Sequence, residues 1–576
     1  MPPPAAMPPR PATGRASVPT APGTPATPQP VPATPQPVPA TPQPVPAARQ
    51  PVPAPQPVPA WQPAPAPQPP PAPSAPPAAR IGHRGLVAAL AAVVVLALAA
   101  VGGLVVRPGP IAGWLGDDPL ATAGASAEPP EPDPPPVLVA ASGELAPTPD
   151  GVKAAIDNLV RGSGLGSRFS VSVVDATTGE SLYARGPDVP TVPASTTKVV
   201  TAVTALAALG PAHRIPTRVV AGTRPGEVVL VGGGDPTLAI NATGSYPTAA
   251  RLDQLAAQVK RALGGATPTR VLVDSSLYQG AVYGPGWDAD IPTGGFAGPA
   301  TALMTNGGRV DPKAIDPAER FTEPDLAAGR SFARLLGLPP AAAAAVSRAT
   351  APPAGGEPTP AGPSGEPTPA GPSGGEATPA PAAPGTELGR VASPPLLRLV
   401  EFMLASSDNV VAEALARQVA IAKDMPASYA GAAAAMKAVI ADLGLPAAEV
   451  TLSDGSGLSR RNRLTPSLLT AVLAKAASGE RPELYGVVSG LPVGGWSGTL
   501  VDRFKAASGT GKAGVGAVRA KTGTLSGVDA MSGVVTTSGG RVLAFALLAD
   551  GVPIGHWDAQ AALDAVAAAL ARCGCR

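Results

Sequence analysis

Cysteine and histidine are scarce in this chain, and their scarcity excludes several kinds of site. The two cysteines, Cys573 and Cys575, stand together at the C-terminus. They are too few for a disulfide-stapled scaffold or a structural zinc site, and they form either a terminal thiol pair or a local disulfide. Only three histidines are present, so a Ser-His-Asp triad is poorly supplied. We expect neither a metal ion nor a cofactor.

Charge is equally sparse. The formal net charge is +2, and charged residues make up 14% of the chain. Recognition of phosphate backbones needs a clustered basic surface, which this balance does not supply. We therefore exclude nucleic acid as a partner.

Proline and glycine, in contrast, are abundant and unevenly spread. Residues 1–85 are dominated by proline and alanine, and the string ATPQPVP occurs three times in tandem from Ala26 to Pro46. Such a composition cannot bury a hydrophobic core, so it predicts a disordered tail with polyproline II character. An inert spacer is the favoured interpretation, and PxxP recognition by a cytoplasmic partner is the alternative.

The tail ends at a long apolar run, Leu86–Val106, which has no charge and is long enough as a helix to cross a bilayer. Five arginines and no acidic residue precede this run, whereas Asp117, Asp118 and Glu128 follow it. The positive-inside rule then places the N-terminus in the cytoplasm and the remainder outside. We expect a single-pass protein of the cell membrane, with 107–146 as a disordered linker. The string ALA at 97–99 could be cleaved, but the long preceding tail favours an uncleaved anchor.

Globular patterning begins near Pro147. Residues 169–185 predict two strands joined at the turn ATTGE, and an apolar helix begins at Ser195. The other predicted elements are strands at 214–222, 226–238, 269–278 and 518–550, and helices at 247–265 and 393–423.

Three short strings carry the chemistry: STTK at 195–198, SDN at 407–409 and KTG at 521–523. Of the ten lysines only Lys198 has a serine three residues before it, which puts Ser195 and Lys198 on one face of a helical turn. Each string alone is weak evidence, since one could be a packing accident and another a turn. Together and in this order they match the set found in penicillin-binding proteins and class A β-lactamases.

The chemistry of these residue types explains the set. Ser195 needs a base, and Lys198 can serve only if its pKa falls from about 10.4 toward neutrality. Burial and a second cation would lower that pKa, and Lys521 would supply the cation while it holds a substrate carboxylate. Ser407 can relay a proton to the leaving amine, and Asn409 offers an amide that orients a peptide.

Further strings narrow the match. The chain from about Pro147 onward resembles the D-alanyl-D-alanine carboxypeptidase/endopeptidase family, the class C low-molecular-mass penicillin-binding proteins. The strings that carry this resemblance are LVGGGDPTL at 230–238, SSDNVVAEALARQVA at 406–420, SDGSGLSR at 453–460 and RAKTGTL at 519–525.

The resemblance implies an α/β (α+β) domain of the serine β-lactamase/transpeptidase type. It would comprise residues 147–212 and 392–576, split by a large, mainly-β insertion at 213–391. Within that insertion, a loop at 351–388 with two tandem copies of GEPTPAGPS is expected to be disordered and exposed. The N-terminal anchor and these repeats depart from many family members, but neither touches a motif residue.

The resemblance also implies an activity: an acyl-Ser195 enzyme that cleaves the terminal D-Ala–D-Ala bond of peptidoglycan stem peptides, or their cross-links, and that β-lactams inhibit. The backbone N–H groups of Ser195 and Thr524 would form its oxyanion hole. The expected substrate-binding residues are Thr522, Gly523, Thr524 and Asp408.

Two rival functions stay open: a β-lactamase or esterase on the same fold, and a β-lactam sensor or wall-tethering module that is acylated and stops. A class A β-lactamase needs a glutamate-activated water, and we identify no glutamate-containing loop at the right interval after SDN. A sensor needs a cytoplasmic effector, whereas residues 1–80 have no foldable composition. Both observations favour hydrolysis of wall peptides.

Some residues allow two interpretations. Asp454 and Ser456 could line the cleft, as in the family, but DGSG is equally a turn. Tyr278, Tyr283 and Trp287 could stack on glycan, although packing inside a small domain is the favoured interpretation.

Overall fold

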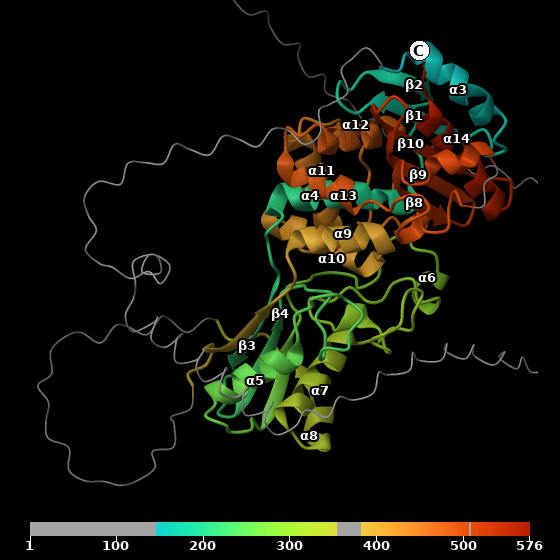
Figure 1. The fold of residues 1–576 in the computed structure, drawn as a ribbon. Helices are drawn as coiled ribbons and strands as arrows, with labels where there is room; N and C mark the ends of the chain where they lie inside the picture. Colours follow the sequence, from blue (N-terminus) through green and yellow to red (C-terminus); the bar gives the residue numbers. More distant parts are fainter. Residues whose placement is uncertain (1–145, 354–381, 506–508, 576) are drawn as a thin grey trace, which may run out of the picture. The chain divides into compact units, whose positions relative to one another are not determined.

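The computed structural model describes residues 146–353, 382–505 and 509–575 (Figure 1). The predicted tail, the apolar run at 86–106 and nearly all of the predicted linker lie outside these ranges. Among the residues that the structure does describe, no helix combines the length and apolarity needed to cross a bilayer. The described residues form two five-stranded sheets and the helices packed on them.

The first sheet joins the two ends of the described chain. Its strand order is β2-β1-β10-β9-β8, with every neighbouring pair antiparallel. The two strands predicted in 169–185 and the strands predicted in 518–550 are thus confirmed. The strands are β1 (Phe169–Asp175), β2 (Ser181–Arg185), β8 (Val518–Leu525), β9 (Val528–Thr536) and β10 (Val542–Asp550).

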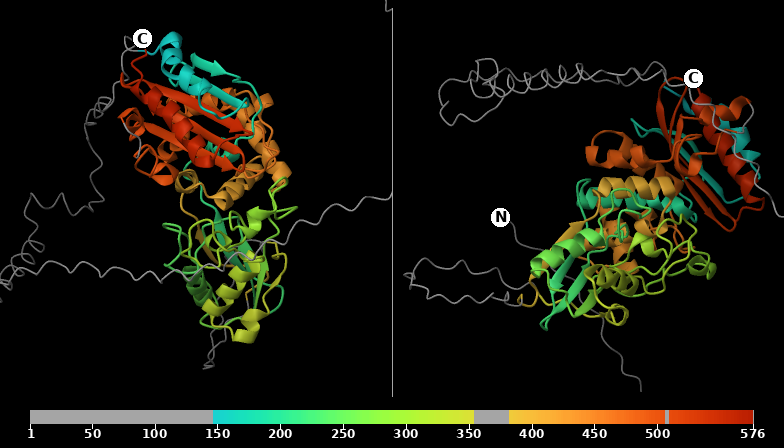
Figure 2. Two further views of the ribbon diagram at one scale, coloured as in Figure 1. Left: turned by 90° about the vertical axis from the view of Figure 1, so that its right-hand side faces the viewer. Right: turned by 60° about the horizontal axis from the view of Figure 1, so that its bottom comes forward.

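Helices α3 (Pro149–Arg161) and α14 (His556–Arg572) lie against this sheet (Figure 2). Their buried residues share one apolar cluster with it. Helix α3 begins where the Thr148 side chain accepts a hydrogen bond from the N–H of Gly151, and Pro149 occupies its first turn. Its buried residues Val152, Ile156 and Val160 recur every four positions, so one face meets the core and the opposite face meets solvent.

A second, helical layer surrounds α4 (Thr197–Leu209). Every residue of α4 from Thr197 to Leu206 is buried, which agrees with the apolar composition that predicted this helix. The other helices of the layer are α9 (Leu396–Ser406), α10 (Asn409–Ala422), α11 (Tyr429–Asp442), α12 (Pro466–Ala477) and α13 (Tyr485–Gly490).

The inserted region corrects one prediction, because it is a mixed α/β unit and not mainly β. In its sheet, of order β6-β5-β4-β3-β7, strands β4, β5 and β6 are parallel. Parallel neighbours need crossover connections, and helices supply them between β4 and β5 and between β5 and β6. The strands are β3 (Pro216–Ala221), β4 (Glu227–Gly232), β5 (Arg270–Asp274), β6 (Ser347–Arg348) and β7 (Glu387–Ala392), and the helices are α5 (Leu252–Ala262), α6 (Asp290–Thr293), α7 (Pro324–Leu336) and α8 (Pro340–Ala344).

The predicted loop at 351–388 is also too long at its C-terminal end. Strand β7 begins at Glu387 and pairs with β3. The tandem GEPTPAGPS copies fall within 354–381, outside the described residues. The loop prediction followed composition, which does not mark where backbone pairing resumes.

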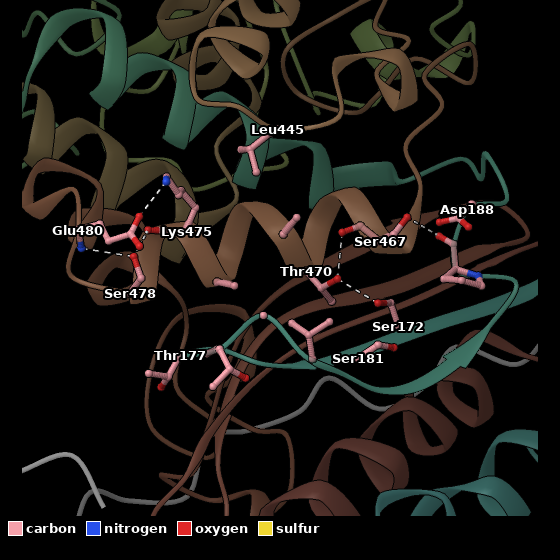
Figure 3. A pocket seen from close by; sticks show the side chains of 17 residues that line it. Ser172, Thr177, Ser181, Asp188, Leu445, Ser467, Thr470, Lys475, Ser478 and Glu480 are labelled. Carbon is pink, nitrogen blue, oxygen red and sulfur yellow. Dashed lines mark hydrogen bonds and ion pairs between the residues drawn. The ribbon is translucent and has the colours of Figure 1, made fainter. Parts of the chain in front are cut away.

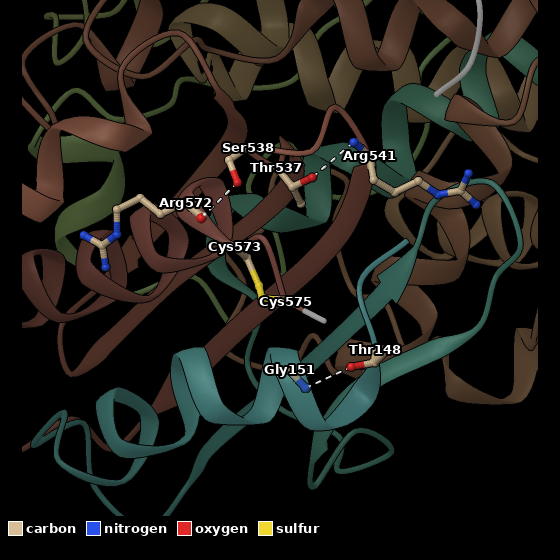
Figure 4. The surroundings of a disulfide bond; sticks show 8 residues. All are labelled: Thr148, Gly151, Thr537, Ser538, Arg541, Arg572, Cys573 and Cys575. Carbon is tan, nitrogen blue, oxygen red and sulfur yellow. Dashed lines mark hydrogen bonds between the residues drawn. A yellow bond between two sulfur atoms is a disulfide. The ribbon is translucent and has the colours of Figure 1, made fainter. Parts of the chain in front are cut away.

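The C-terminal tail lies against the start of α3 (Figure 4). Cys573 and Cys575 form a disulfide, so the local-disulfide alternative is the one that the structure adopts. The carbonyl of Cys575 accepts a hydrogen bond of 2.7 Å from the N–H of Thr148. A side chain on Gly151 would collide with the Cys575 backbone, since its Cβ would lie 2.6 Å from the carbonyl oxygen. Glycine at 151 therefore permits this contact.

We predict that Gly151→Ala lowers the thermal stability of the full chain, because the new methyl group displaces the tail. In a chain that ends at Arg572 the same substitution should stabilise the protein by up to about 1 kcal/mol, because alanine is the better helix former. Thermal unfolding of the four variants measures both effects. Equal effects of Gly151→Ala with and without the tail would contradict the contact.

Candidate active site

Ser195 lies in a 3-10 turn, Ala194–Thr196, which leads directly into α4. The Lys198 Nζ is 2.9 Å from the Ser195 Oγ, so the structure brings together the two residues that the spacing placed on one face. Ser195 is half-buried, whereas Lys198 is fully buried. Ala194 has a φ of 45°, a left-handed conformation that a residue other than glycine seldom adopts. The turn that presents Ser195 is therefore held in place by its neighbours.

The SDN string forms the sharp turn between α9 and α10. Ser407 ends α9 with a φ of 61°, and Asn409 begins α10. The Asn409 Oδ1 accepts a hydrogen bond of 2.7 Å from the Lys198 Nζ, and its Nδ2 donates to the carbonyl of Phe296 at 3.0 Å. Ser407 is half-buried, and its hydroxyl makes no direct hydrogen bond to Ser195 or Lys198 among the described contacts.

The KTG string lies in β8, the edge strand nearest Ser195. Lys521 is fully buried, and its Nζ donates to the carbonyl of Thr522 at 2.8 Å. A Cβ on Gly523 would lie 2.8 Å from the carbonyl oxygen of Pro193 and 3.1 Å from the backbone nitrogen of Ser195. Only glycine at 523 lets the strand approach the serine backbone this closely. The Thr522 hydroxyl lies 2.9 Å from that of Thr499, and Thr524 is exposed.

Burial dominates the electrostatics of both amines. It lowers the pKa of Lys198 to about 8, although the carboxylates of Asp454 and Glu413 oppose that shift. Burial and the charge of Lys198 together hold the pKa of Lys521 well below its usual value. We expected Lys521 to be a main cause of the lowered pKa of Lys198, but desolvation is the first cause in the structure. The repulsion between the two amines lowers the pKa of Lys521.

Asp408 departs from its expected substrate-binding role. Its carboxylate accepts hydrogen bonds from the N–H groups of Val410 and Val411, both at 2.9 Å, and so caps the start of α10. The Tyr246 hydroxyl donates to it at 2.8 Å, and Arg309 pairs with it at 3.0 Å. Because the carboxylate is buried and fully occupied, it positions the SDN turn and does not face a substrate. The sequence places Asp408 between two cleft residues but does not show that its side chain points inward.

The loop at 454–457 supplies contacts that the three strings did not predict. The carbonyl of Ser456 accepts a hydrogen bond of 2.7 Å from the Lys198 Nζ. Gly457 has a φ of 87°, and a Cβ there would collide with the carbonyl of Ala194 and lie 2.9 Å from the Thr197 Oγ1. DGSG is thus a turn, as one interpretation held, and its backbone also reaches the site. The string SDGSGLSR was the sequence signal for this loop.

Glu413 is a residue that sequence reasoning missed. It stands four positions after Asn409 on α10, and its carboxylate accepts from the N–H groups of Gly455 and Ser456 at 3.1 and 2.8 Å. Helical spacing places Glu413 on the same face as Asn409, but nothing in the sequence shows that this face is covered by the 454–457 loop.

The three aromatic residues behave differently from one another. Trp287 donates from Nε1 to the Asp454 carboxylate at 2.7 Å, and the ring of the half-buried Tyr278 lies beneath the guanidinium of Arg417. Both therefore pack within the protein, as favoured. Tyr283 is 39% exposed and does not share that packing.

A separate cavity of about 480 Å³ lies between the β1–β2 hairpin and α12 (Figure 3). The hydroxyls of Ser172 and Thr470 meet at 2.9 Å in it, and Lys475 pairs with Glu480 at its rim. None of the predicted site residues lines this cavity. This cavity is therefore separate from the Ser195 site.

Known proteins resemble both the sequence and the fold. The family whose sequence model matches is described as D-Ala-D-Ala carboxypeptidase 3 (S13), and it matches residues 152–333 and 376–573. A carboxypeptidase of Mycobacterium tuberculosis is 39% identical over 464 residues, which cover 79% of this chain and 91% of the relative. A D-alanyl-D-alanine carboxypeptidase of an Actinomadura species is 30% identical over 450 residues, covering 67% of this chain and 78% of the relative.

Among solved structures, penicillin binding protein 4 of Haemophilus influenzae aligns with a TM-score of 0.54 at 22% identity, covering 71% of this chain and 97% of that one. This likeness shows a mixed α/β fold of the same type. The family match shows more: the chain belongs to the D-Ala-D-Ala carboxypeptidase 3 (S13) family and is a serine-type carboxypeptidase. The resemblance read from the sequence strings is confirmed.

We predict that Gly457→Ala destabilises the protein more than Gly479→Ala does, by about 2 kcal/mol. Both glycines have a positive φ, but a Cβ on Gly479 meets nothing within 4 Å, whereas one on Gly457 meets Ala194. The matched pair therefore separates the collision from the cost of the backbone conformation. Denaturant unfolding measures the difference, and equal losses would show that the loop is free to move away from Ala194.

Proposed function

We propose that this enzyme cleaves the terminal D-Ala–D-Ala bond of peptidoglycan stem peptides, or the D-Ala-to-diamino-acid cross-link, through an acyl-Ser195 intermediate. The observation that carries this proposal is the 2.9 Å contact between the Ser195 Oγ and the Nζ of Lys198, whose pKa burial lowers to about 8. An amine with such a pKa is a usable base near neutral pH. Family membership supports the choice of bond.

In the acylation step, the Ser195 Oγ attacks the carbonyl carbon of the penultimate D-Ala, and its proton passes to the Lys198 Nζ. The peptide C–N bond then breaks, and the leaving amine of the terminal D-Ala takes a proton relayed through Ser407. Water next attacks the acyl-serine ester and regenerates Ser195. The backbone N–H groups of Ser195 and Thr524 would stabilise the oxyanion, and the approach that Gly523 permits supports this pairing.

In this proposal the substrate carboxylate both binds to Lys521 and affects the protonation of Lys198. Without a ligand, burial and Lys198 disfavour the charged form of Lys521. A bound carboxylate would favour that charged form, and the new ammonium would in turn disfavour a proton on Lys198. The free carboxylate would therefore help to bind the peptide and to release the base. Thr522 and Thr524 stand on the same strand and would offer it hydroxyl groups.

β-Lactams would acylate the same serine, because their ring amide and carboxylate mimic the peptide. A fast-deacylating β-lactamase or esterase, and a sensor that stops at the acyl-enzyme, are the alternatives that turnover measurements separate.

We predict that the full-length enzyme in detergent cleaves a pentapeptide ending in D-Ala–D-Ala well and the C-terminally amidated peptide poorly. A fluorescent penicillin should label Ser195 and leave slowly. Ser195→Ala should abolish labelling and cleavage, and Lys521→Ala should reduce both by at least about a hundredfold through lost carboxylate binding and a raised Lys198 pKa. Rates on the two peptides and release of the label are the measurements.

Lys475→Ala is the matched control, since Lys475 pairs with Glu480 away from the cleft and its loss should leave these rates unchanged. Undiminished labelling of Ser195→Ala would refute the assignment of the nucleophile. Rapid repeated β-lactam turnover without peptide cleavage would establish the β-lactamase, and labelling without turnover of any peptide would establish the sensor.

We also propose that the apolar run at 86–106 anchors the enzyme in the cell membrane with its catalytic part outside. The arginine asymmetry around that run supports this orientation. The proposed substrate also lies outside the cytoplasmic membrane.

The orientation predicts that protease added to intact protoplasts digests the part of the chain after residue 106 and spares an N-terminal tag. Immunoblots for tags at the two ends measure the outcome, and lysed protoplasts serve as the control in which both tags are lost. Protection of the C-terminal tag, or release of a shortened soluble form, would contradict the anchor.

A further inference from the structure

The Lys198 amine has three hydrogen-bond acceptors, and only two of them belong to the predicted motifs. These two are the Ser195 Oγ at 2.9 Å and the Asn409 Oδ1 at 2.7 Å. The third is the backbone carbonyl of Ser456 at 2.7 Å. Ser456 also donates its N–H to Glu413 at 2.8 Å, so Glu413 holds the residue whose carbonyl accepts from the lysine.

Glu413 sits in an enclosed network of charge. It is 3% exposed, and its second carboxylate oxygen pairs with Arg417, 1% exposed, at 3.3 Å. The guanidinium of Arg417 lies 4.1 Å from the ring centroid of Tyr429 and 5.3 Å from that of Tyr278. Two of its nitrogens have no hydrogen-bond partner in the described structure, and the two rings offer the guanidinium cation–π contacts instead. Arg417 is thus a fixed cation that favours an ionised Glu413.

Glu413 is ionised in the pH range where Lys198 changes its protonation state. Burial, with a contribution from Asp454, raises the pKa of Glu413 to about 7. Glu413 is therefore largely ionised near pH 8, where Lys198 changes its protonation state. A negative charge at Glu413 stabilises the ammonium that Lys198 becomes when it accepts the serine proton.

We infer that Glu413 is a positioning residue for the acylation step: it aims the Ser456 carbonyl at Lys198, and its charge, held by Arg417, balances the ammonium formed there. This inference rests on the proposed acyl-Ser195 chemistry. It assigns two separable effects to the Glu413 side chain. One is the position of the Ser456 carbonyl, and the other is the pKa of Lys198.

Other charges also face Lys198. Lys521 comes from β8, Asp454 from the 454–457 loop, Asp408 from the start of α10, and Asp316 from the inserted region. Asp454 is held by several donors, namely Trp287, Ser459, Gly457, Asn462 and Ser456. Glu413 binds the N–H groups of Gly455 and Ser456 on one side of the Ser456 carbonyl, and Asp454 binds the N–H of Gly457 on the other side. Glu413 differs from Asp454 because its carboxylate is paired with the buried Arg417.

The test is the pH dependence of acylation by a fluorescent penicillin, measured on the full-length enzyme. In the wild type the rate should rise with pH through about 8, as Lys198 loses its proton. Glu413→Gln keeps an oxygen that accepts both N–H bonds but removes the charge, so the midpoint should fall by about one pH unit. Glu413→Asp keeps the charge but is one methylene too short, so the midpoint should stay while the rate falls about tenfold or more.

Glu449→Gln is the matched control. Glu449 accepts a hydrogen bond from Ser467 at 3.0 Å, apart from the Lys198 contacts, and its neutralisation should change neither the midpoint nor the rate. If Glu413→Gln does not fold, the double variant Glu413→Gln/Arg417→Met removes both partners of the buried pair together, which proteins tolerate better than losing one. Its midpoint should still fall, since Glu413 acts on the pKa of Lys198 more strongly than Arg417 does.

A wild-type midpoint in folded Glu413→Gln, or in the double variant where it is needed, would overturn the inference. So would a full wild-type rate in Glu413→Asp. Failure of the proposed function would look different, because the wild type itself would then not be acylated or Ser195→Ala would be labelled normally.

Discussion

The burial of two lysine amines side by side is the constraint on which the site depends. Lys198 and Lys521 are both fully buried, and water would otherwise keep each amine protonated. Desolvation lowers the pKa of Lys198 to about 8, which suits the base role that we propose, while Asp454 and Glu413 oppose that shift. The surrounding structure keeps water from these amines. Helix α4 is buried along most of its length, and Gly523 and Gly457 let β8 and the 454–457 loop pack closely against the turn that carries Ser195.

The inserted region is part of this construction. The carbonyl of Phe296 accepts from Asn409, Arg309 pairs with the capping carboxylate of Asp408, and Trp287 donates to Asp454. Each of these contacts joins a residue of the insertion to the SDN turn or to the 454–457 loop. The buried pair between Arg309 and Asp408 ties the insertion to the start of α10. Removing Arg309 would leave the carboxylate of Asp408 buried and unpaired, which is costly. The insertion therefore supports the SDN turn.

The family match and the geometry answer different questions. Membership of the S13 carboxypeptidase family identifies the class of reaction, and the likeness to a Haemophilus penicillin binding protein identifies the fold at low sequence identity. Neither describes the proton transfer from Ser195 that we propose. That account comes from the three acceptors around Lys198 and from the Glu413–Arg417 pair behind one of them.

The sequence by itself predicted the strands of the first sheet and the helices α4, α5, α9 and α10, because apolar periodicity reflects which face each strand or helix buries. It also determined that Ser195 and Lys198 meet, since residues three apart share a helical face. Only the tertiary structure decided what distant segments do: that Asp408 turns inward to cap α10, that parallel strands and helices make the insertion α/β, and that Glu413 reaches the Ser456 peptide. Those outcomes depend on packing between segments far apart in the chain, which local patterns of residues do not encode.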